Sequence, residues 1–126
     1  MRVLACCLSF VLAVSSLGAQ QPAGTIVNPV PPAAKSVAAG RQSFQRYCAP
    51  CHNDDGKGNG PLAPRNVHPP DLTDAEWLHG GTDGEIFTSI REGIGPKFDM
   101  KSMKSRMTDA EIWNIVNYLR SIGPKP

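Results

Sequence analysis

The stretch from residue 53 to residue 81 constrains the fold more than any other, because it cannot form a regular element. Residues 53–61 read Asn-Asp-Asp-Gly-Lys-Gly-Asn-Gly-Pro, which is turn chemistry throughout, and Pro69-Pro70 blocks a helix. A compact domain seldom contains so long a loop unless the loop packs on a large rigid ligand. The aromatic residues (four Phe, two Trp and two Tyr) also make a thin core for 126 residues. We therefore expect something other than side chains to fill part of the interior.

A motif directly before this loop indicates what that ligand is. Residues 48–52 read Cys-Ala-Pro-Cys-His, the Cys-x-x-Cys-His pattern that attaches haem c. Two thiols three positions apart at the end of a helix can each add across one vinyl group of a haem, which gives two thioether bonds. The imidazole of the next residue is then held beneath the iron. We predict one covalently attached haem c per chain, bound by Cys48 and Cys51, with His52 as an axial ligand of the iron.

Two other uses of a cysteine pair fit the sequence less well. A thioredoxin-type redox pair expects a βαβ context, and no segment of the chain reads as a β-strand of useful length. A zinc site needs two further ligands, which only His68 and His79 could supply. Histidines in a proline-rich loop or beside a pair of glycines are more often surface residues, and we interpret both in that way.

The N-terminus carries the pattern of a secretory signal peptide. Arg2 precedes an uncharged apolar stretch that ends in the small residues Gly18-Ala19, so we predict a signal over residues 1–19 and an exported, periplasmic or extracytoplasmic product. Retention as a membrane anchor is the alternative, although the stretch is short for a span. Cleavage would leave one closely spaced cysteine pair, which is not a disulfide scaffold. Residues 20–35 contain four prolines and predict a flexible or polyproline-like lead-in, a tether or a surface strap.

Three segments have the apolar periodicity of helices, so the predicted fold is all-α. The first covers residues 36–48, where Gly40 and Phe44 lie on one apolar face. A glycine on that face indicates either a closely crossing backbone or a merely tolerated residue. The other two helices begin at capping boxes, Thr82 with Glu85 and Thr108 with Glu111, and end at Gly93 and at Gly123-Pro124. A single helical turn is also expected over residues 74–78.

Together these features resemble the class I c-type cytochromes, in which three main helices and long loops wrap one covalently bound haem. The resemblance covers a predicted monohaem cytochrome c domain over residues 36–123. It rests on Gly40, Phe44 and the cysteine motif, on Gly60-Pro61, and on Met100 ahead of the segment from Met107 to Leu119. It implies that the first and last helices cross near Gly40 and pack on the haem. It also implies that the backbone carbonyl of Pro61 accepts a hydrogen bond from the His52 imidazole.

The resemblance also implies a methionine as the second axial ligand. Met107 stands at the position of a hydrophobic staple before the last helix, facing Ile112. Met100 lies seven residues before Met107, which is the spacing of the ligand in the family, and is our first candidate; Lys101 stands where the family commonly has proline. Met103 is the alternative axial ligand. A histidine ligand or an open sixth position is the remaining alternative. A His/Met pair raises the reduction potential of the haem.

Charge and ligation together narrow the expected function. A net charge of +2 is too balanced for a nucleic-acid binder. With both axial positions filled, the iron is closed to substrate, so we predict no enzyme but a small exported one-electron carrier that meets other redox proteins transiently. The alternative is a cytochrome c subunit of a larger oxidoreductase complex, and a third interpretation is a gas-binding or peroxidatic protein with an open site. Membrane contact is expected only if the N-terminal segment is retained.

A cluster of basic residues near the predicted methionine ligand bears on the partner. The cluster consists of Lys97, Lys101, Lys104 and Arg106. It could steer an acidic redox partner towards the haem edge, and the attraction would weaken with salt. An ordinary solvated loop is the competing interpretation.

Overall fold

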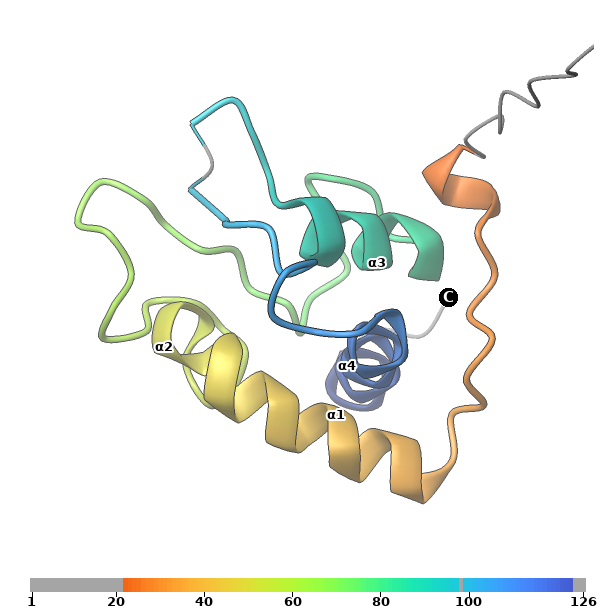
Figure 1. The fold of residues 1–126 in the computed structure, drawn as a ribbon. Coiled ribbons are helices and arrows are strands. Elements are labelled where there is room, and N and C mark those ends of the chain that lie inside the picture. Colours follow the sequence, from red (N-terminus) through yellow and green to blue (C-terminus); the bar gives the residue numbers. More distant parts are fainter. Residues whose placement is uncertain (1–21, 98, 124–126) are drawn as a thin grey trace, which may run out of the picture.

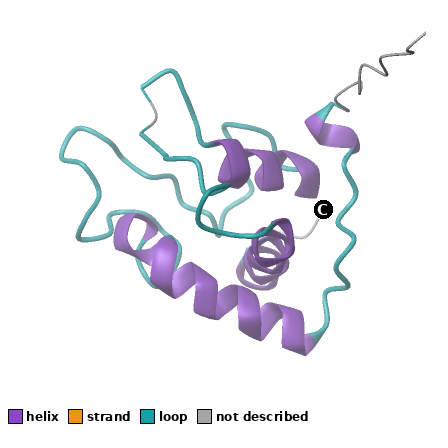
Figure 2. Cartoon of the chain, viewed as in Figure 1, coloured by secondary structure: helices purple, strands orange, loops and turns teal. Residues whose placement is uncertain are grey.

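The computed structural model describes residues 22–97 and 99–123, and this part of the chain is helical (Figures 1 and 2). It contains the helices α1 (Ala34–Tyr47), α2 (Ala49–His52), α3 (Asp83–Glu92) and α4 (Asp109–Ile122), with a short 3-10 turn, η1 (Ala23–Thr25). Among these residues the only β-type pairing is an isolated bridge between Ile94 and Met100, so the predicted all-α class is confirmed. The predicted signal peptide lies outside the described residues. No helix in the described ranges has the length and apolar content to cross a membrane.

The capping residues begin both later helices where the sequence predicts. The Thr82 hydroxyl accepts from the Glu85 amide, and the Glu85 carboxylate accepts from the Thr82 amide at 2.9 Å. Thr108 and Glu111 form the same box at the start of α4. Such reciprocal bonds satisfy amides that have no partner inside the helix.

Two local expectations were wrong. Helix α1 begins at Ala34, two residues before the predicted start. The segment 74–78 forms bends and turns instead of a helical turn. The carboxylate of Asp74 accepts a hydrogen bond from the Glu76 amide at 2.8 Å, and this local bond competes with helix formation.

The core lies where α1 crosses α4. A Cβ atom on Gly40 would stand 1.9 Å from the carbonyl oxygen of Asn114, so the two backbones are in direct contact at this point. Phe44 is fully buried beside Tyr118, with ring centroids 5.3 Å apart. The close crossing predicted from Gly40 is therefore confirmed, and the alternative of a merely tolerated glycine is wrong.

Residues 22–33 form a strap against the helices. The side chain of Asn117 in α4 is buried. Its oxygen accepts a hydrogen bond from the side-chain amide of Asn28 at 2.8 Å, and its nitrogen donates to the carbonyl of Val30 at 3.0 Å and to Ser36 Oγ at 2.7 Å. A Cβ atom on Gly84 would lie 2.1 Å from the carbonyl oxygen of Ala23. This segment is a docked strap, since a flexible lead-in would not fill a buried amide's hydrogen bonds.

The remaining chain forms two loops on the side of the helices away from the strap (Figure 1). The first loop covers residues 53–81, and the second covers residues 93–107 between α3 and α4. We call this side the loop half, and the crossing of α1 and α4 with its strap the helical half. All the predicted cofactor ligands lie in the loop half or on α2 beside it.

Candidate functional site

The two cysteines and the histidine lie on a single turn of helix. Helix α1 ends at Tyr47, and α2 follows at Ala49 with a proline in its first turn, a position where a missing amide hydrogen does no harm. The amides of Cys51 and His52 both donate to the carbonyl of Cys48, at 3.0 and 2.9 Å. Both cysteines are half-buried and free of disulfides. The turn therefore groups the three side chains that the sequence predicts to bind haem.

Burial favours the uncharged forms of Cys48 and His52. It raises the pKa of the Cys48 thiol to about 12, with a smaller contribution from the nearby Cys51. Burial lowers the pKa of His52, and the carbonyl of Pro70 opposes this effect only in part. Nδ1 of His52 is buried and has no hydrogen-bond partner of normal geometry among the described residues. A neutral imidazole is the form that binds a metal.

The carbonyl that acts on the pKa of His52 belongs to Pro70, and the hydrogen bond from His52 to Pro61 stays a prediction. The amides of Gly60 and Leu62 donate to the carbonyls of Cys51 and Pro50, both at 2.8 to 2.9 Å, and so hold residues 60–62 against the outside of α2. Pro61 is accordingly exposed there.

The loop then returns to the histidine further along the chain. The amide of Leu72 donates to the carbonyl of Gly56 at 2.8 Å, and a Cβ atom on Gly58 would lie 2.2 Å from the carbonyl oxygen of Pro69. These contacts bring Pro70 beside His52. The proline pair was visible in the sequence, but the path of the loop was not.

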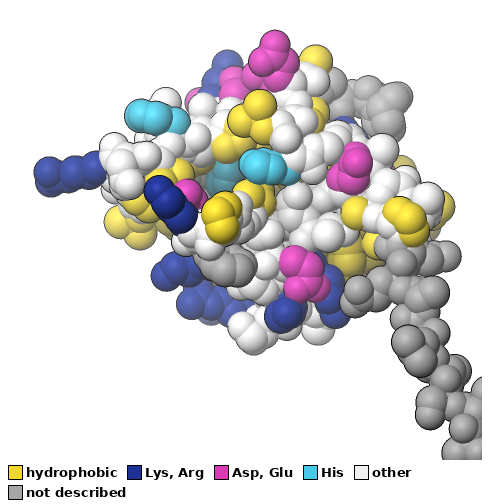
Figure 3. Space-filling view, turned by 90° about the horizontal axis from the view of Figure 1, so that it is seen from above, with side chains coloured by type: hydrophobic (Ala, Val, Ile, Leu, Met, Phe, Trp, Pro, Cys, Tyr) yellow, Lys and Arg dark blue, Asp and Glu magenta, His cyan; other side chains and the backbone are white. Residues whose placement is uncertain are grey.

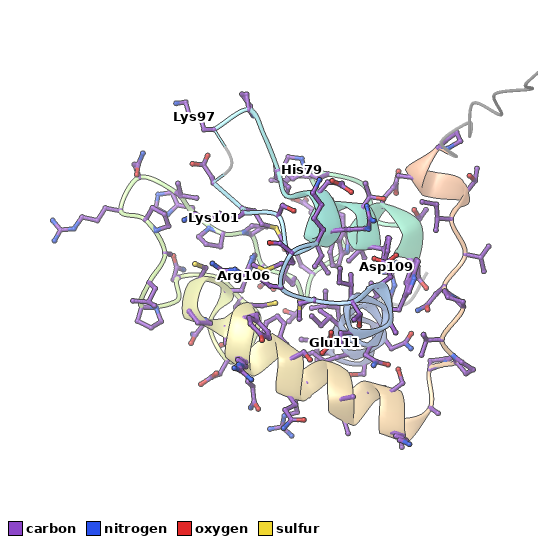
Figure 4. The ribbon with its side chains drawn as sticks, in the orientation of Figure 1. His79, Lys97, Lys101, Arg106, Asp109 and Glu111 are labelled. Atoms are coloured by element: carbon purple, nitrogen blue, oxygen red, sulfur yellow. The ribbon has the colours of Figure 1, made fainter. Side chains whose placement is uncertain are left out.

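The second loop carries the candidate methionines. Met107 is 6% exposed and lies in the same core cluster as Ile112, which is the position expected of a staple. Met100 and Met103 are half-buried and pack against the edge of that cluster. Both therefore have the placement of a side chain that faces a group beside the core. His68 and His79 are exposed, as predicted for surface residues; Figure 4 labels His79.

The donor set fits a covalently attached haem. Two free thiols and a neutral imidazole lie on one helical turn, and a ring nitrogen of the following loop, Trp77 Nε1, is buried without a hydrogen-bond partner in the described residues. Orphaned buried nitrogens are rare in folded proteins and indicate a group that these residues are built to meet. Residues 22–97 and 99–123 contain no set of three His, Cys, Asp or Glu side chains arranged for a metal ion, so they give the zinc alternative no support.

The charged side chains beside the second loop divide into paired and unpaired groups. Arg91 pairs with Asp109 and Lys104 pairs with Glu92, each at 3.0 Å. By contrast, three exposed residues form no ion pair within the described part of the chain, and we call them the basic loop surface: Lys97, Lys101 and Arg106. Figure 4 shows them along the loop before α4, and Figure 3 shows Lys and Arg side chains gathered on one side of this face.

The sequence of the chain is similar to that of a known protein family and its members. Residues 35–119 match the family model described as Cytochrome C oxidase, cbb3-type, subunit III. The chain is 37% identical over 89 residues to the Cbb3-type cytochrome c oxidase subunit CcoP of Cereibacter sphaeroides, which covers 68% of this chain. It is 34% identical over 92 residues to the subunit CcoP of Rhodobacter capsulatus, which covers 69%. It spans only 27% and 29% of these two relatives.

Solved structures show the same arrangement of helices and loops. Cytochrome c6 from the diatom Phaeodactylum tricornutum matches with a TM-score of 0.53 and 27% identity, over 68% of this chain and 91% of that one. Cytochrome CL from Methylophaga aminisulfidivorans matches with a TM-score of 0.59 and 24% identity, over 71% of this chain and 55% of that one. At that identity the second likeness concerns the fold alone.

Proposed function

The chain belongs to the family described as Cytochrome C oxidase, cbb3-type, subunit III, and on that basis we propose that it is the cytochrome c subunit of a larger oxidoreductase complex. Its fold is that of a class I monohaem c-type cytochrome, and its cofactor is one covalently attached haem c. The relatives are named as oxidase subunits, which favours this interpretation over the free carrier that the sequence predicts first. The chain spans less than a third of each relative, and the role we propose for it in such a complex is electron transfer.

Each ligand has a separate task in this proposal. Cys48 and Cys51 hold the haem through thioether bonds, and His52 binds the iron through its neutral ring. The carbonyl of Pro70 orients that ring, a contact that fixes a ligand's direction and raises its basicity. Met100 would be the second protein ligand of the iron, with Met103 as the alternative. The bound haem supplies a one-electron couple between Fe(II) and Fe(III), and the chain's own residues bury it and keep water from it.

The observation that carries the proposal is the turn of α2, in which both thiols and a neutral histidine lie together inside a matching family domain. The proposal is tested by gel filtration of a native extract, in which haem absorbance and a tag on this chain are monitored in the eluted fractions. We expect the tagged haem to co-elute with a catalytic subunit. Elution alone, near the 13.5 kDa of the chain, would exclude the subunit role and restore the free carrier. Absence of haem from the tagged chain would overturn both.

The site and the N-terminal sequence also support proposals on the cellular location of the domain and on the coordination of the haem iron. We place the domain over residues 36–123 outside the cytoplasm, with residues 1–19 acting as a cleaved signal or a retained anchor. Mass spectrometry of the mature N-terminus separates the two.

Exposure of the reduced protein to carbon monoxide tests whether the iron has a free coordination position. If both axial positions are filled by the protein, the absorbance spectrum stays unchanged. Rapid binding of carbon monoxide would favour the gas-binding or peroxidatic interpretation instead.

The basic loop surface favours the proposal that the redox partner docks through an acidic face. Lys97, Lys101 and Arg106 carry charge that no described carboxylate neutralises, and opposite charge on a partner raises the rate of encounter at low salt. Electron transfer to anionic and cationic small-molecule oxidants reports this local charge. Changing the three residues to Glu should slow the reaction with the anion and speed that with the cation.

The same change of charge on α1, at Lys35, Arg41 and Arg46, is the matched control because these residues lie on another element. Equal effects of the two triple variants would show that only net charge matters, and would leave the basic loop surface without a role in docking.

A further inference from the structure

The end of helix α3 is fastened to the loop that carries Met100. The last carbonyls of a helix have no partner inside it. Here the carbonyl of Ile90 accepts from the Met103 amide at 3.1 Å, and that of Arg91 accepts from the Lys104 amide at 3.2 Å. The Arg91 carbonyl also accepts from Ser102 Oγ at 2.7 Å. We call these three hydrogen bonds the α3 clamp.

A second set of contacts holds the carbonyl of Met100 itself. The amide of Ile94 donates to the carbonyl of Met100 at 2.9 Å. Gly93, which ends α3, has a φ of +79°, and a Cβ atom there would lie 2.6 Å from the Met100 carbonyl oxygen and 2.7 Å from the Ser102 amide nitrogen. The backbone is therefore held at the carbonyl of Met100 and at the residues that follow it, within a loop that otherwise has little regular structure.

Ser102 is the side chain that can be tested within the clamp. The backbone bonds of Met103 and Lys104 persist in any variant, whereas the hydroxyl of Ser102 can be removed by a single substitution. Ser102 is half-buried and only two positions from Met100. The Lys104 ammonium also pairs with Glu92 at 3.0 Å, but both of those side chains are more than 40% exposed and add little.

We propose that Ser102 is a positioning residue for the sulfur of Met100: its hydrogen bond to the Arg91 carbonyl holds the methionine loop in the geometry that binds the haem iron. This inference rests on the axial role of Met100 proposed above. Loss of the hydroxyl removes the clamp bond nearest to Met100 in the sequence, so that an external ligand competes more easily with the methionine for the iron. The residue touches neither iron nor haem and acts only through Met100.

The test measures the affinity of the oxidised holoprotein for imidazole and the red charge-transfer band of an iron–methionine sulfur bond. Ser102→Ala should raise the affinity for imidazole about fivefold, the effect of one hydrogen bond of ordinary strength, and weaken the band. Ser102→Thr keeps the hydroxyl and should restore both. Ser105→Ala is the matched control, because Ser105 is exposed in the same loop and makes no hydrogen bond to the described residues.

The outcomes separate this inference from the assignment of Met100. If Met100→Ala abolishes the band but Ser102→Ala changes neither the band nor the affinity for imidazole, the positioning role is overturned and the ligand stands. The same conclusion holds if Ser102→Ala lowers only the free energy of unfolding. If Met103→Ala abolishes the band and Met100→Ala does not, the axial assignment itself fails, and this inference falls with it.

Discussion

The helical half and the loop half of this molecule are both held by close backbone contacts, but their interiors differ. In the helical half, Phe44, Ile115 and Val116 have no exposed surface, and the buried amide of Asn117 has its hydrogen bonds filled. In the loop half, Met100 and Met103 stay half-buried, and two buried ring nitrogens have no partner among the described residues. The helical half is thus specified by its own side chains, whereas we propose that the loop half is shaped around the haem.

The largest effect is expected at the crossing of α1 and α4. A Cβ atom on Gly40 would meet the backbone of Asn114 at 1.9 Å, and backbone cannot move aside as a flexible side chain can. Gly40→Ala should lower the free energy of unfolding in urea by about 3 kcal/mol, the upper range for overpacking. Gly24→Ala is the control, since its Cβ would meet only ordinary contacts at 3.7 Å or more. Equal losses in both variants would contradict the crossing.

The next effect is expected at the contact between the strap and α4. Asn117→Ala leaves the Asn28 amide and the Val30 carbonyl without a partner beside a buried site. We expect a loss of about 2 kcal/mol in the free energy of unfolding, as for buried polar groups left unsatisfied. The exposed Asn66 gives the control, because Asn66→Ala should stay within about 0.5 kcal/mol. If Asn117→Ala behaves like Asn66→Ala, the strap does not stabilise the helical half.

A glycine of the loop half should respond differently from Gly40. Gly58 has a φ of +82°, and its Cβ would lie 2.2 Å from the Pro69 carbonyl oxygen. Gly58→Ala should lower the free energy of unfolding by about 1 to 2 kcal/mol, the usual penalty for that backbone conformation, because the loop at Pro69, unlike the packed helix at Asn114, can shift to relieve the contact. It should also raise the affinity for imidazole, because it displaces the segment that places Pro70 beside His52.

That second readout is the one that divides the two halves, since Gly40→Ala should leave the affinity for imidazole unchanged. A change in affinity in both glycine variants would mean that the halves are not independent.

The smallest effect is expected at the helix caps. Thr108→Ala removes a cap hydroxyl and should lower the free energy of unfolding by about 1 kcal/mol. Hydrogen bonds from the Thr108 amide and hydroxyl hold the pKa of Glu111 below its usual value. A lowered folded-state pKa gives stability that is present above the unfolded pKa and is lost as pH falls through the folded one.

The deficit of Thr108→Ala should therefore shrink at acid pH, below the ordinary glutamate pKa of about 4.3. Urea unfolding at several pH values measures this, and a deficit that does not depend on pH would contradict the role of the Glu111 carboxylate in the box.

The sequence predicts the helical half in most of its detail. Capping boxes are local signals, so the starts at Thr82 and Thr108 and the end at Gly93 agree with the structure. The crossing at Gly40 was one of two interpretations that the sequence left open, and the contact with Asn114 decides between them. The buried bonds of Asn117 were missed, since they join segments more than 80 positions apart.

For the loop half, the sequence predicts which residues bind the haem but not the course of the backbone through the two loops. The spacing of Cys48, Cys51 and His52 specifies which groups share a turn, and the structure places them on one. The resemblance named Pro61 and did not consider Pro70, because hydrogen bonds between distant loop backbones decide which proline lies beside His52, and the sequence pattern does not reveal them. The α3 clamp was invisible for the same reason, since it depends on where the Met100 loop meets a helix end.

The intact mass of the denatured protein, purified from cells that attach haem, tests most directly whether the loop half is built around a covalently bound cofactor. We predict a mass larger than that of the mature polypeptide by one haem, and a Cys48→Ala/Cys51→Ala variant whose mass equals that of its bare polypeptide. A wild-type protein that is colourless and has the bare mass would contradict the account.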